Sequence, residues 1–205
     1  TSPDRAHALL GPIELALMGE SDVRIAQALV WRKAGAGRGI AAEKFLSQIP
    51  EIPASLLQHR DEFPLLTLVA GHIGNVKACR MAGLKHKEYG YTDETLVPFD
   101  ERRTLPKQWT WIRAHDGTPN LGRKPSVCRA ECIESQFLYS GIDSVGVAIY
   151  LVHGKRGHVM DLPESVCADD RNVCASVCPF GISDLCADRG DDTNPMYGSA
   201  VFVRE

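Results

Sequence analysis

The stretch that decides the fold prediction is VGVAIYLVHGKRGHVMDL, residues 145–162. Residues 145–152 are apolar throughout, as expected of an interior strand that is covered on both faces. Residues 153–157 contain two glycines and predict a turn. Residues 158–162 can then return as a second strand, so the stretch predicts an antiparallel hairpin at the centre of the molecule.

Composition limits the classes of protein to which this chain can belong. Its 205 residues suffice for one domain or two small ones, and 44% hydrophobic with 24% charged residues can form an ordinary core. The net charge is −3 and no block of like charges occurs, which disfavours a nucleic-acid partner. The apolar runs are far shorter than the roughly 20 residues that cross a bilayer, so no membrane span is expected.

Residues 4–84 lack the alternation of polar and apolar residues that marks half-buried strands, so a helical region is predicted over residues 1–90. One helix is expected to begin at Ser21-Asp22, to end near Lys33 and to bury one stripe of side chains: Val23, Ala26, Leu29 and Val30. The sequence AGAGRG, residues 34–39, predicts an interhelical turn, since no strand precedes it as in a phosphate-binding loop. Residues 65–84 predict a pair of antiparallel helices.

The character of the sequence changes after residue 94. Residues 95–99 and 108–114 are rich in aromatic and β-branched residues and predict strands. Trp109 and Trp111 are two apart, so they face the same side of their strand and are expected to belong to the core. The chain therefore predicts an α+β protein in one compact unit. A helical region, residues 1–90, packs on a small, mostly antiparallel sheet with a cysteine-rich C-terminal half, residues 91–205.

The cysteines are concentrated near the C-terminus. The chain has seven, and six follow residue 127: Cys128, Cys132, Cys167, Cys174, Cys178 and Cys186. Residues 126–138 predict a helix with Cys128 and Cys132 on one face, because they are four residues apart. Residues 163–178 predict a helix with three further cysteines on one stripe, followed by a loop, residues 184–194, that carries Cys186. Residues 198–203 predict a closing strand.

The first functional hypothesis is a cysteine-dependent hydrolase or deamidase. A thiol near a helix N-terminus loses its proton more readily, and an imidazole on an adjacent strand can accept that proton. Cys132 or Cys128 would be the nucleophile and His158 the base, with His153 as a competing base. A helix-borne cysteine followed by a strand-borne histidine resembles papain-like amidases and bacterial cysteine deamidase toxins. Gly157-His158-Val159 also resembles the Gly-His-Val that is frequent in the amidases. The resemblance implies a thiol hydrolase and a secreted effector.

Two other interpretations use the same cysteines. In the first, the chain is a non-enzymatic binding or assembly protein that is cross-linked by disulfides of unspecified pairing. It would have a protein or peptide partner and a secreted or periplasmic location. In the second, cysteine and histidine side chains hold zinc, for which Cys128/Cys132 and Cys174/Cys178 approach the usual ligand spacing. No other cofactor is expected. The plainest interpretation is that the cysteines are small apolar core residues.

Overall fold

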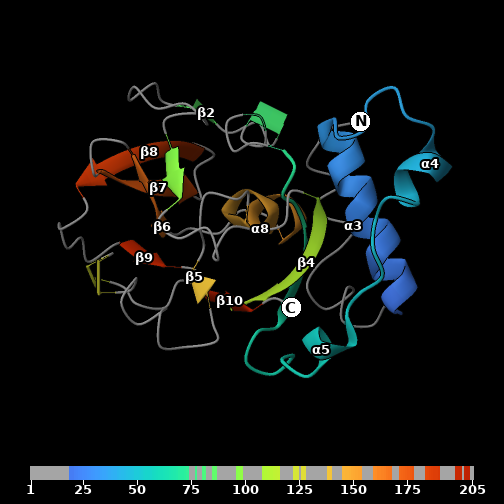
Figure 1. The fold of residues 1–205 in the computed structure, drawn as a ribbon, viewed down its shortest axis with the longest axis horizontal. Helices are drawn as coiled ribbons and strands as arrows, with labels where there is room; N and C mark the ends of the chain where they lie inside the picture. The colour runs from blue at the N-terminus through green and yellow to red at the C-terminus, as the bar shows by residue number, and fades with distance from the viewer. Residues whose placement is uncertain are drawn as a thin grey trace.

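The strands that the structure describes form two sheets. The computed structural model describes residues 19–73, 77, 80–81, 85–86, 96–98, 108–115, 122–124, 126–127, 138–139, 145–153, 159–167, 171–177, 183–189, 197–199 and 201–203. The main helices are α3 (Glu20–Ala34), α4 (Ala42–Leu46), α5 (Ala54–Leu57) and α8 (Val145–His153) (Figure 1). The strands are β1 (Leu65–Ala70), β2 (Lys85–His86), β3 (Leu96–Pro98), β4 (Trp109–Ala114), β5 (Leu138–Tyr139), β6 (Val159–Cys167), β7 (Arg171–Val177), β8 (Ser183–Arg189), β9 (Tyr197–Ser199) and β10 (Val201–Val203).

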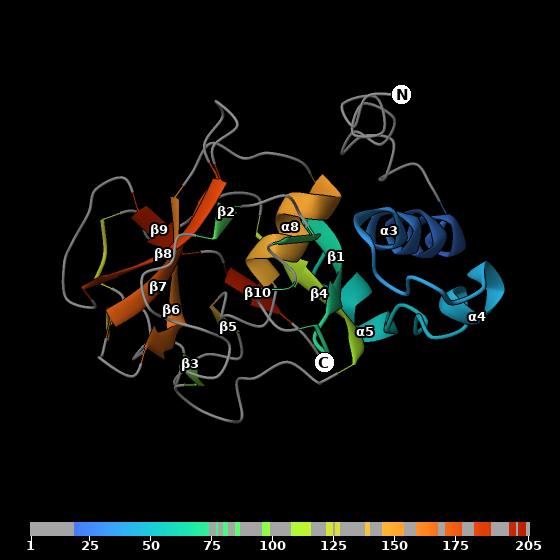
Figure 2. The same cartoon turned by 90° about the horizontal axis from the view of Figure 1, so that it is seen from above.

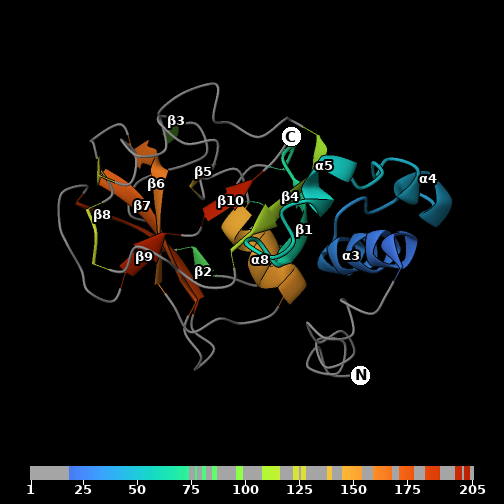
Figure 3. The same cartoon turned by 90° about the horizontal axis from the view of Figure 1, so that it is seen from below.

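Strands that are neighbours in a sheet are often not consecutive in the chain. The first sheet has the order β1-β4-β10-β5 and is antiparallel throughout. The second has the order β2-β8-β7-β6-β3, with β9 beside β6; β2 with β8 and β9 with β6 are its parallel pairs. All three views place the second sheet at the opposite end of the molecule from α3 and α4 (Figures 1 to 3). Together with the helices, these sheets make an α+β fold.

The first sheet is covered on both faces. Leu68 lies opposite Trp111, and Ala70 lies opposite Trp109, so these four side chains share one face of the β1–β4 pair. Figure 2 shows α8 on one side of this pair and α3, α4 and α5 on the other. Trp109 and Trp111 are buried, which confirms their prediction as core residues. A sheet with both faces covered needs no polar face, and β1 and β4 accordingly read LLTLVA and WTWIRA.

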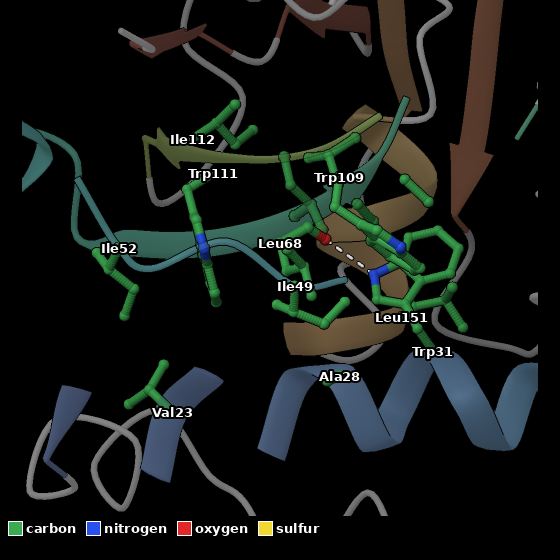
Figure 4. Close-up of a cluster of buried hydrophobic side chains, with 14 of the residues drawn as sticks. Val23, Ala28, Trp31, Ile49, Ile52, Leu68, Trp109, Trp111, Ile112 and Leu151 are labelled. Carbon is green, nitrogen blue, oxygen red and sulfur yellow. Dashed lines mark hydrogen bonds between the residues drawn. The ribbon is translucent and has the colours of Figure 1, made fainter. Parts of the chain in front are cut away.

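Side chains of helix α3 form hydrogen bonds with the backbone at the free edge of β1. The Gln27 side chain donates from Nε2 to the Leu66 carbonyl at 2.8 Å, and its Oε1 accepts from the Leu68 backbone N–H at 2.7 Å. Trp31 donates from Nε1 to the Leu68 carbonyl at 2.8 Å, as the dashed line in Figure 4 shows. Buried backbone groups need partners, and an edge strand has none on its outer side. The side chains of α3 therefore take the place of a neighbouring strand.

The glycines after α3 have conformations that other residues rarely adopt. Gly35 ends the helix with φ of 111°, and its N–H donates to the Arg32 and Trp31 carbonyls. A Cβ at Gly37, where φ is 65°, would lie 2.3 Å from the Phe45 ring. Both observations confirm the predicted turn between two helices and give a physical reason for its glycines.

The central hairpin predicted over residues 145–162 is wrong. Residues 145–152 belong to α8, which packs on β1 and buries Ala148, Ile149, Leu151 and Val152. A helix in the core is apolar on all sides, so a short apolar run does not distinguish it from a buried strand. The following segment does form a strand, β6, but its partners are β3, β7 and β9.

Three further predictions of local structure are wrong. Residues 65–70 form β1 instead of a helix, although Lys77, Arg80 and Met81 are helical. Residues 163–178 contribute to the strands β6 and β7 instead of a helix, and β8 occupies part of the predicted loop. Pro163 lies in β6 where the pairing with β7 is interrupted, between Leu162 and Val166. Proline cannot donate to a ladder, so an interruption is where a strand tolerates it.

The prediction of helix α3 is confirmed, and so is the burial of Val23, but one other residue of the predicted stripe is exposed. The helix runs from Glu20 to Ala34 with Gly19 as its N-cap. Leu29, predicted to be buried, is 48% exposed, whereas the polar Gln27 is buried because it serves the edge of β1. The strands predicted near residues 95–99 and 108–114 are confirmed by β3 and β4, whereas residues 198–203, predicted as a single closing strand, belong to two short strands in different sheets, β9 and β10.

Candidate functional site

The predicted nucleophiles and base lie outside the described residues. Cys128, Cys132 and His158 all fall in this category, so their proposed contact stays a prediction. The residues nearest to them in sequence are described. Ser126 and Val127 are helical, in agreement with the predicted start of a helix there. Val159, which follows His158 in the chain, is the first residue of β6.

The competing base, His153, is the last residue of α8 and is partly buried against the first sheet. Its Nε2 lies 2.9 Å from the Thr67 hydroxyl on β1. Burial lowers the pKa of His153 to about 4, although a backbone hydrogen bond to Leu66 acts in the opposite direction. A neutral imidazole has one ring nitrogen that accepts and one that donates. At neutral pH this side chain is therefore an uncharged hydrogen-bonding group.

Thr67 and His153 have the distance of a nucleophile and its base, but their surroundings argue against that role. The Thr67 side chain is 0% exposed, and its hydroxyl also lies 3.3 Å from the Leu65 carbonyl. A nucleophile must be reached by its substrate, whereas this hydroxyl lies between a sheet and a helix. The pair instead links β1 to the end of α8. These surroundings argue against Thr67 as a nucleophile, and the contact of His153 with Cys128 or Cys132 stays a prediction.

Arg113 is the charged side chain among the buried polar residues of the first sheet, and it too has a structural role. Its Nη1 donates to the Phe63 carbonyl at 3.0 Å and to the Pro64 carbonyl at 3.3 Å. Burial, followed by the nearby Arg60, lowers the pKa of Arg113. Its hydrogen bonds thus hold the chain where it enters β1, although its buried Nε has no hydrogen-bond partner among the described residues.

His72 lies just after β1 and is exposed, as expected of a turn residue. Its ring packs edge-on against Trp109 with centroids 4.9 Å apart. Partial burial, and then the charge of Lys77, lower the pKa of His72. This histidine is on the side of the sheet that carries the tryptophans, away from the Thr67–His153 pair.

The second sheet brings cysteines together in a way that the predicted helix did not. Cys167 ends β6, Cys174 is central in β7, and Cys186 is central in β8. The register places Cys174 directly opposite Cys186 on one side and opposite Asp161 on the other. Cys167 lies opposite Leu96 of β3. Three positions thus form a row across three neighbouring strands: Asp161, Cys174 and Cys186.

A signal for this arrangement is present in the sequence. In β7 the apolar residues Val173, Ala175 and Val177 alternate with polar residues and Cys174, and β8 shows the same alternation around Leu185. A period of two is typical of a strand. The spacings of seven and four between cysteines, which predicted a helix, are therefore incidental.

No zinc site can be assigned in the described part of the chain, where no three His, Cys, Asp or Glu side chains gather closely enough to hold a metal ion. The zinc hypothesis, which draws on residues beyond that part, stays a prediction. None of the described helices has the length and apolar character that crossing a membrane requires. Comparison with known proteins finds no matching protein family, no matching curated protein and no matching solved structure.

Proposed function

We propose that this chain is a non-enzymatic binding or assembly protein whose cysteine-rich C-terminal half is stabilised by disulfide bonds. The observation that carries the proposal is the position of Cys167, Cys174 and Cys186 in three neighbouring strands of one sheet. Thiols on adjacent strands can form bonds that restrict the unfolded chain, which stabilises the fold. Such bonds persist in secreted and periplasmic proteins, and we propose one of these locations for this chain.

The surface of α3 supports the binding part of the proposal. Ile25 and Leu29 are 39% and 48% exposed and lie four residues apart, so they share one face of the helix. Large apolar side chains that are grouped on a surface are typical of contacts with another protein. We accordingly propose a protein or peptide partner.

The test is a mass measurement of the full chain after alkylation in denaturant, with and without prior reduction, combined with metal analysis. The proposal expects at least two of the six C-terminal cysteines to resist alkylation until they are reduced, with no zinc present. Full alkylation without reduction in metal-free protein would contradict it. Resistance that a chelator removes, while a reductant is not needed, would instead support the zinc hypothesis.

A cysteine-dependent hydrolase or deamidase is the second candidate, with Cys132 or Cys128 as nucleophile and His158 as base. It is supported by Val159 being the first residue of β6, which agrees with the strand predicted over residues 158–162. Such an enzyme should show one cysteine that is alkylated faster than the others in the folded protein. His158→Ala should remove this difference in alkylation rate without unfolding the chain. The control is Cys79→Ser, a substitution outside the proposed site, which should leave the difference unchanged.

A further inference from the structure

The strands β7 and β8 form a continuous antiparallel pair. Their register runs without a shift from Arg171 opposite Arg189 to Val177 opposite Ser183. Cys174 and Cys186 are the middle pair of this ladder, with three residue pairs on either side. Both strands are interior, because β6 lies beyond β7 and β2 lies beyond β8. The register of the two cysteines is fixed by the residue pairs on either side of them in the β7–β8 ladder and, for Cys174, also by its pairing with Asp161 of β6.

We infer that Cys174 and Cys186 form a disulfide bond across β7 and β8. The inference rests on the proposed function in that it needs an oxidising environment, and it goes further by naming the pair. Opposite residues of antiparallel strands have Cα atoms about 4.5 or 5.5 Å apart, depending on the type of pair. Disulfides join residues whose Cα atoms are about 4.4–6.8 Å apart. The Cα separation of both types of pair lies within this range, so the bond needs no change of register.

The residue pattern argues against these two cysteines being ordinary core residues. Side chains at alternate positions of a strand lie on opposite faces of its sheet. Cys174 shares its face with Asn172 and Ser176, and Cys186 shares its face with Asp184 and Asp188. The other face of the same strands is apolar in its middle part, with Val173, Ala175, Val177, Leu185 and Ala187, and polar only toward its ends, with Arg171, Ser183 and Arg189. Cysteines that serve only as small apolar residues would be expected among that set.

The chemistry requires an oxidant, for which we assign a disulfide of low molecular weight. The thiolate of one cysteine attacks a sulfur of the oxidant, forms a mixed disulfide and releases one thiolate. The thiolate of the other cysteine attacks the protein sulfur of that mixed disulfide, and a second thiolate leaves. The two protein thiols have then lost two electrons and two protons, and the oxidant has become two thiols.

The bond can be mapped in the unmodified protein. No lysine or arginine lies between Cys174 and Cys186, so trypsin leaves both cysteines, and Cys178, in the peptide of residues 172–189. A second protease that cleaves before aspartate separates residues 172–183 from residues 184–187. After free thiols are blocked in denaturant, we expect these two peptides to be joined until a reductant is added. Fragmentation should place the link at Cys174 and leave Cys178 blocked.

Matched variants identify the pair. Cys174→Ser and Cys186→Ser should each abolish the link, while Cys178→Ser and Cys167→Ser should retain it. Cys167 is the informative control because it lies in the adjacent strand opposite a leucine. Each single variant of the pair should also lower Tm by about 5–10 °C under oxidising conditions and by nothing under reducing conditions. The mapping of the unmodified protein decides the question even if a variant fails to fold.

Other outcomes would overturn the inference and are distinguishable from failure of the proposed function. A link through Cys178, or bridges confined to other cysteines, would contradict the pairing and leave a disulfide-stabilised protein. Complete alkylation of all cysteines without reduction would contradict both. Alkylation of Cys174 and Cys186 that a chelator alone permits would show that the two cysteines bind a metal ion instead of each other.

Discussion

The pairs β1–β4 and β7–β8 are built on opposite sequence patterns. β1 and β4 are apolar at nearly every position and buried on both faces, and their outer edge is completed by side chains of α3. β7 and β8 alternate polar and apolar residues and have strands on both outer edges. The first pair depends on what covers it, whereas the second depends on its ladder and, by our inference, on a bond between its middle residues.

This difference predicts which substitutions should destabilise each pair of strands. A strand covered on both faces loses stability when a covering side chain is removed, because a cavity or an unpaired backbone group remains. An interior ladder is less sensitive to single side chains. The expected effects on the free energy of unfolding differ accordingly, and the largest belong to α3.

Trp31→Ala should have the largest effect, a loss of about 3–5 kcal/mol. Trp31 is 0% exposed, packs edge-on against Trp109 at 5.7 Å and donates a hydrogen bond to the edge of β1. Urea denaturation monitored by circular dichroism measures the loss. Trp31→Phe keeps a six-membered ring but loses the N–H and the fused five-membered ring, so its loss should lie between zero and that of Trp31→Ala. A loss below about 1 kcal/mol for Trp31→Ala would contradict the close packing of α3 on β1.

The same experiment sharpens the comparison when it is repeated with a reductant. Trp31 belongs to the first sheet and the inferred bond to the second, so the two effects should add. Reduction should lower the stability of Trp31→Ala and of the unmodified chain by equal amounts. Unequal losses would mean that the two sheets stabilise each other.

Gln27→Met should cost about 2–4 kcal/mol, since the buried Leu66 carbonyl and Leu68 N–H each lose a partner worth roughly 1–3 kcal/mol. Methionine nearly preserves the shape, so the loss isolates the hydrogen bonds. The control is Gln58→Met, at an exposed position, which should change stability by less than about 0.5 kcal/mol. Equal effects for the two variants would show that the edge of β1 finds other partners.

His153 should make stability depend on pH. Its pKa in the folded protein is about 4, below the ordinary value of 6.5, so the unfolded chain binds a proton first as pH falls. The contribution is therefore complete above the ordinary pKa and is lost as pH falls toward the folded one. Between pH 7 and pH 5 the loss should be about 2 kcal/mol.

Denaturation at several pH values, compared with His153→Gln, isolates this contribution. The variant should lose the part of the pH dependence that His153 supplies and keep the part from His72, whose pKa is also lowered. The difference between the two curves should grow as pH falls below the ordinary pKa of histidine. Parallel curves would contradict a neutral, buried His153.

The sequence was informative where its pattern had a single structural meaning. Aromatic and β-branched residues in β4 predicted a strand, and the pair Trp109 and Trp111 predicted core positions, as found. Helix α3 and the glycine turn after it were recognisable from their punctuation. The apolar runs of β1 and α8 were both assigned wrongly, in opposite directions, because each is buried on all sides and therefore lacks a period.

The candidate site was less predictable for two physical reasons. The cysteines of β6 and β7 have a spacing that fits a helix, and the alternation that marks a strand is visible only in the residues between them. The partners Thr67 and His153 are far apart in sequence and meet because α8 packs on β1. Such a contact depends on the fold, and a fold prediction that placed residues 145–152 in a strand could not produce it.

Substitutions on the exposed face of α3 should have the smallest effect on stability, and this distinguishes the exposed side of the helix from its buried side. Ile25→Ser and Leu29→Ser remove exposed apolar side chains, so each should change the free energy of unfolding by less than about 0.5 kcal/mol. Val23→Ser, on the buried side of the same helix, is the matched comparison and should cost several times more, because it removes a buried side chain and leaves a hydroxyl in its place. Urea denaturation of the three variants measures the difference. A large loss for Leu29→Ser would mean that another part of the chain covers this face, which would remove it as support for a partner. A small loss leaves the face free for one, because a surface that the fold does not need can be used for binding without a cost in stability.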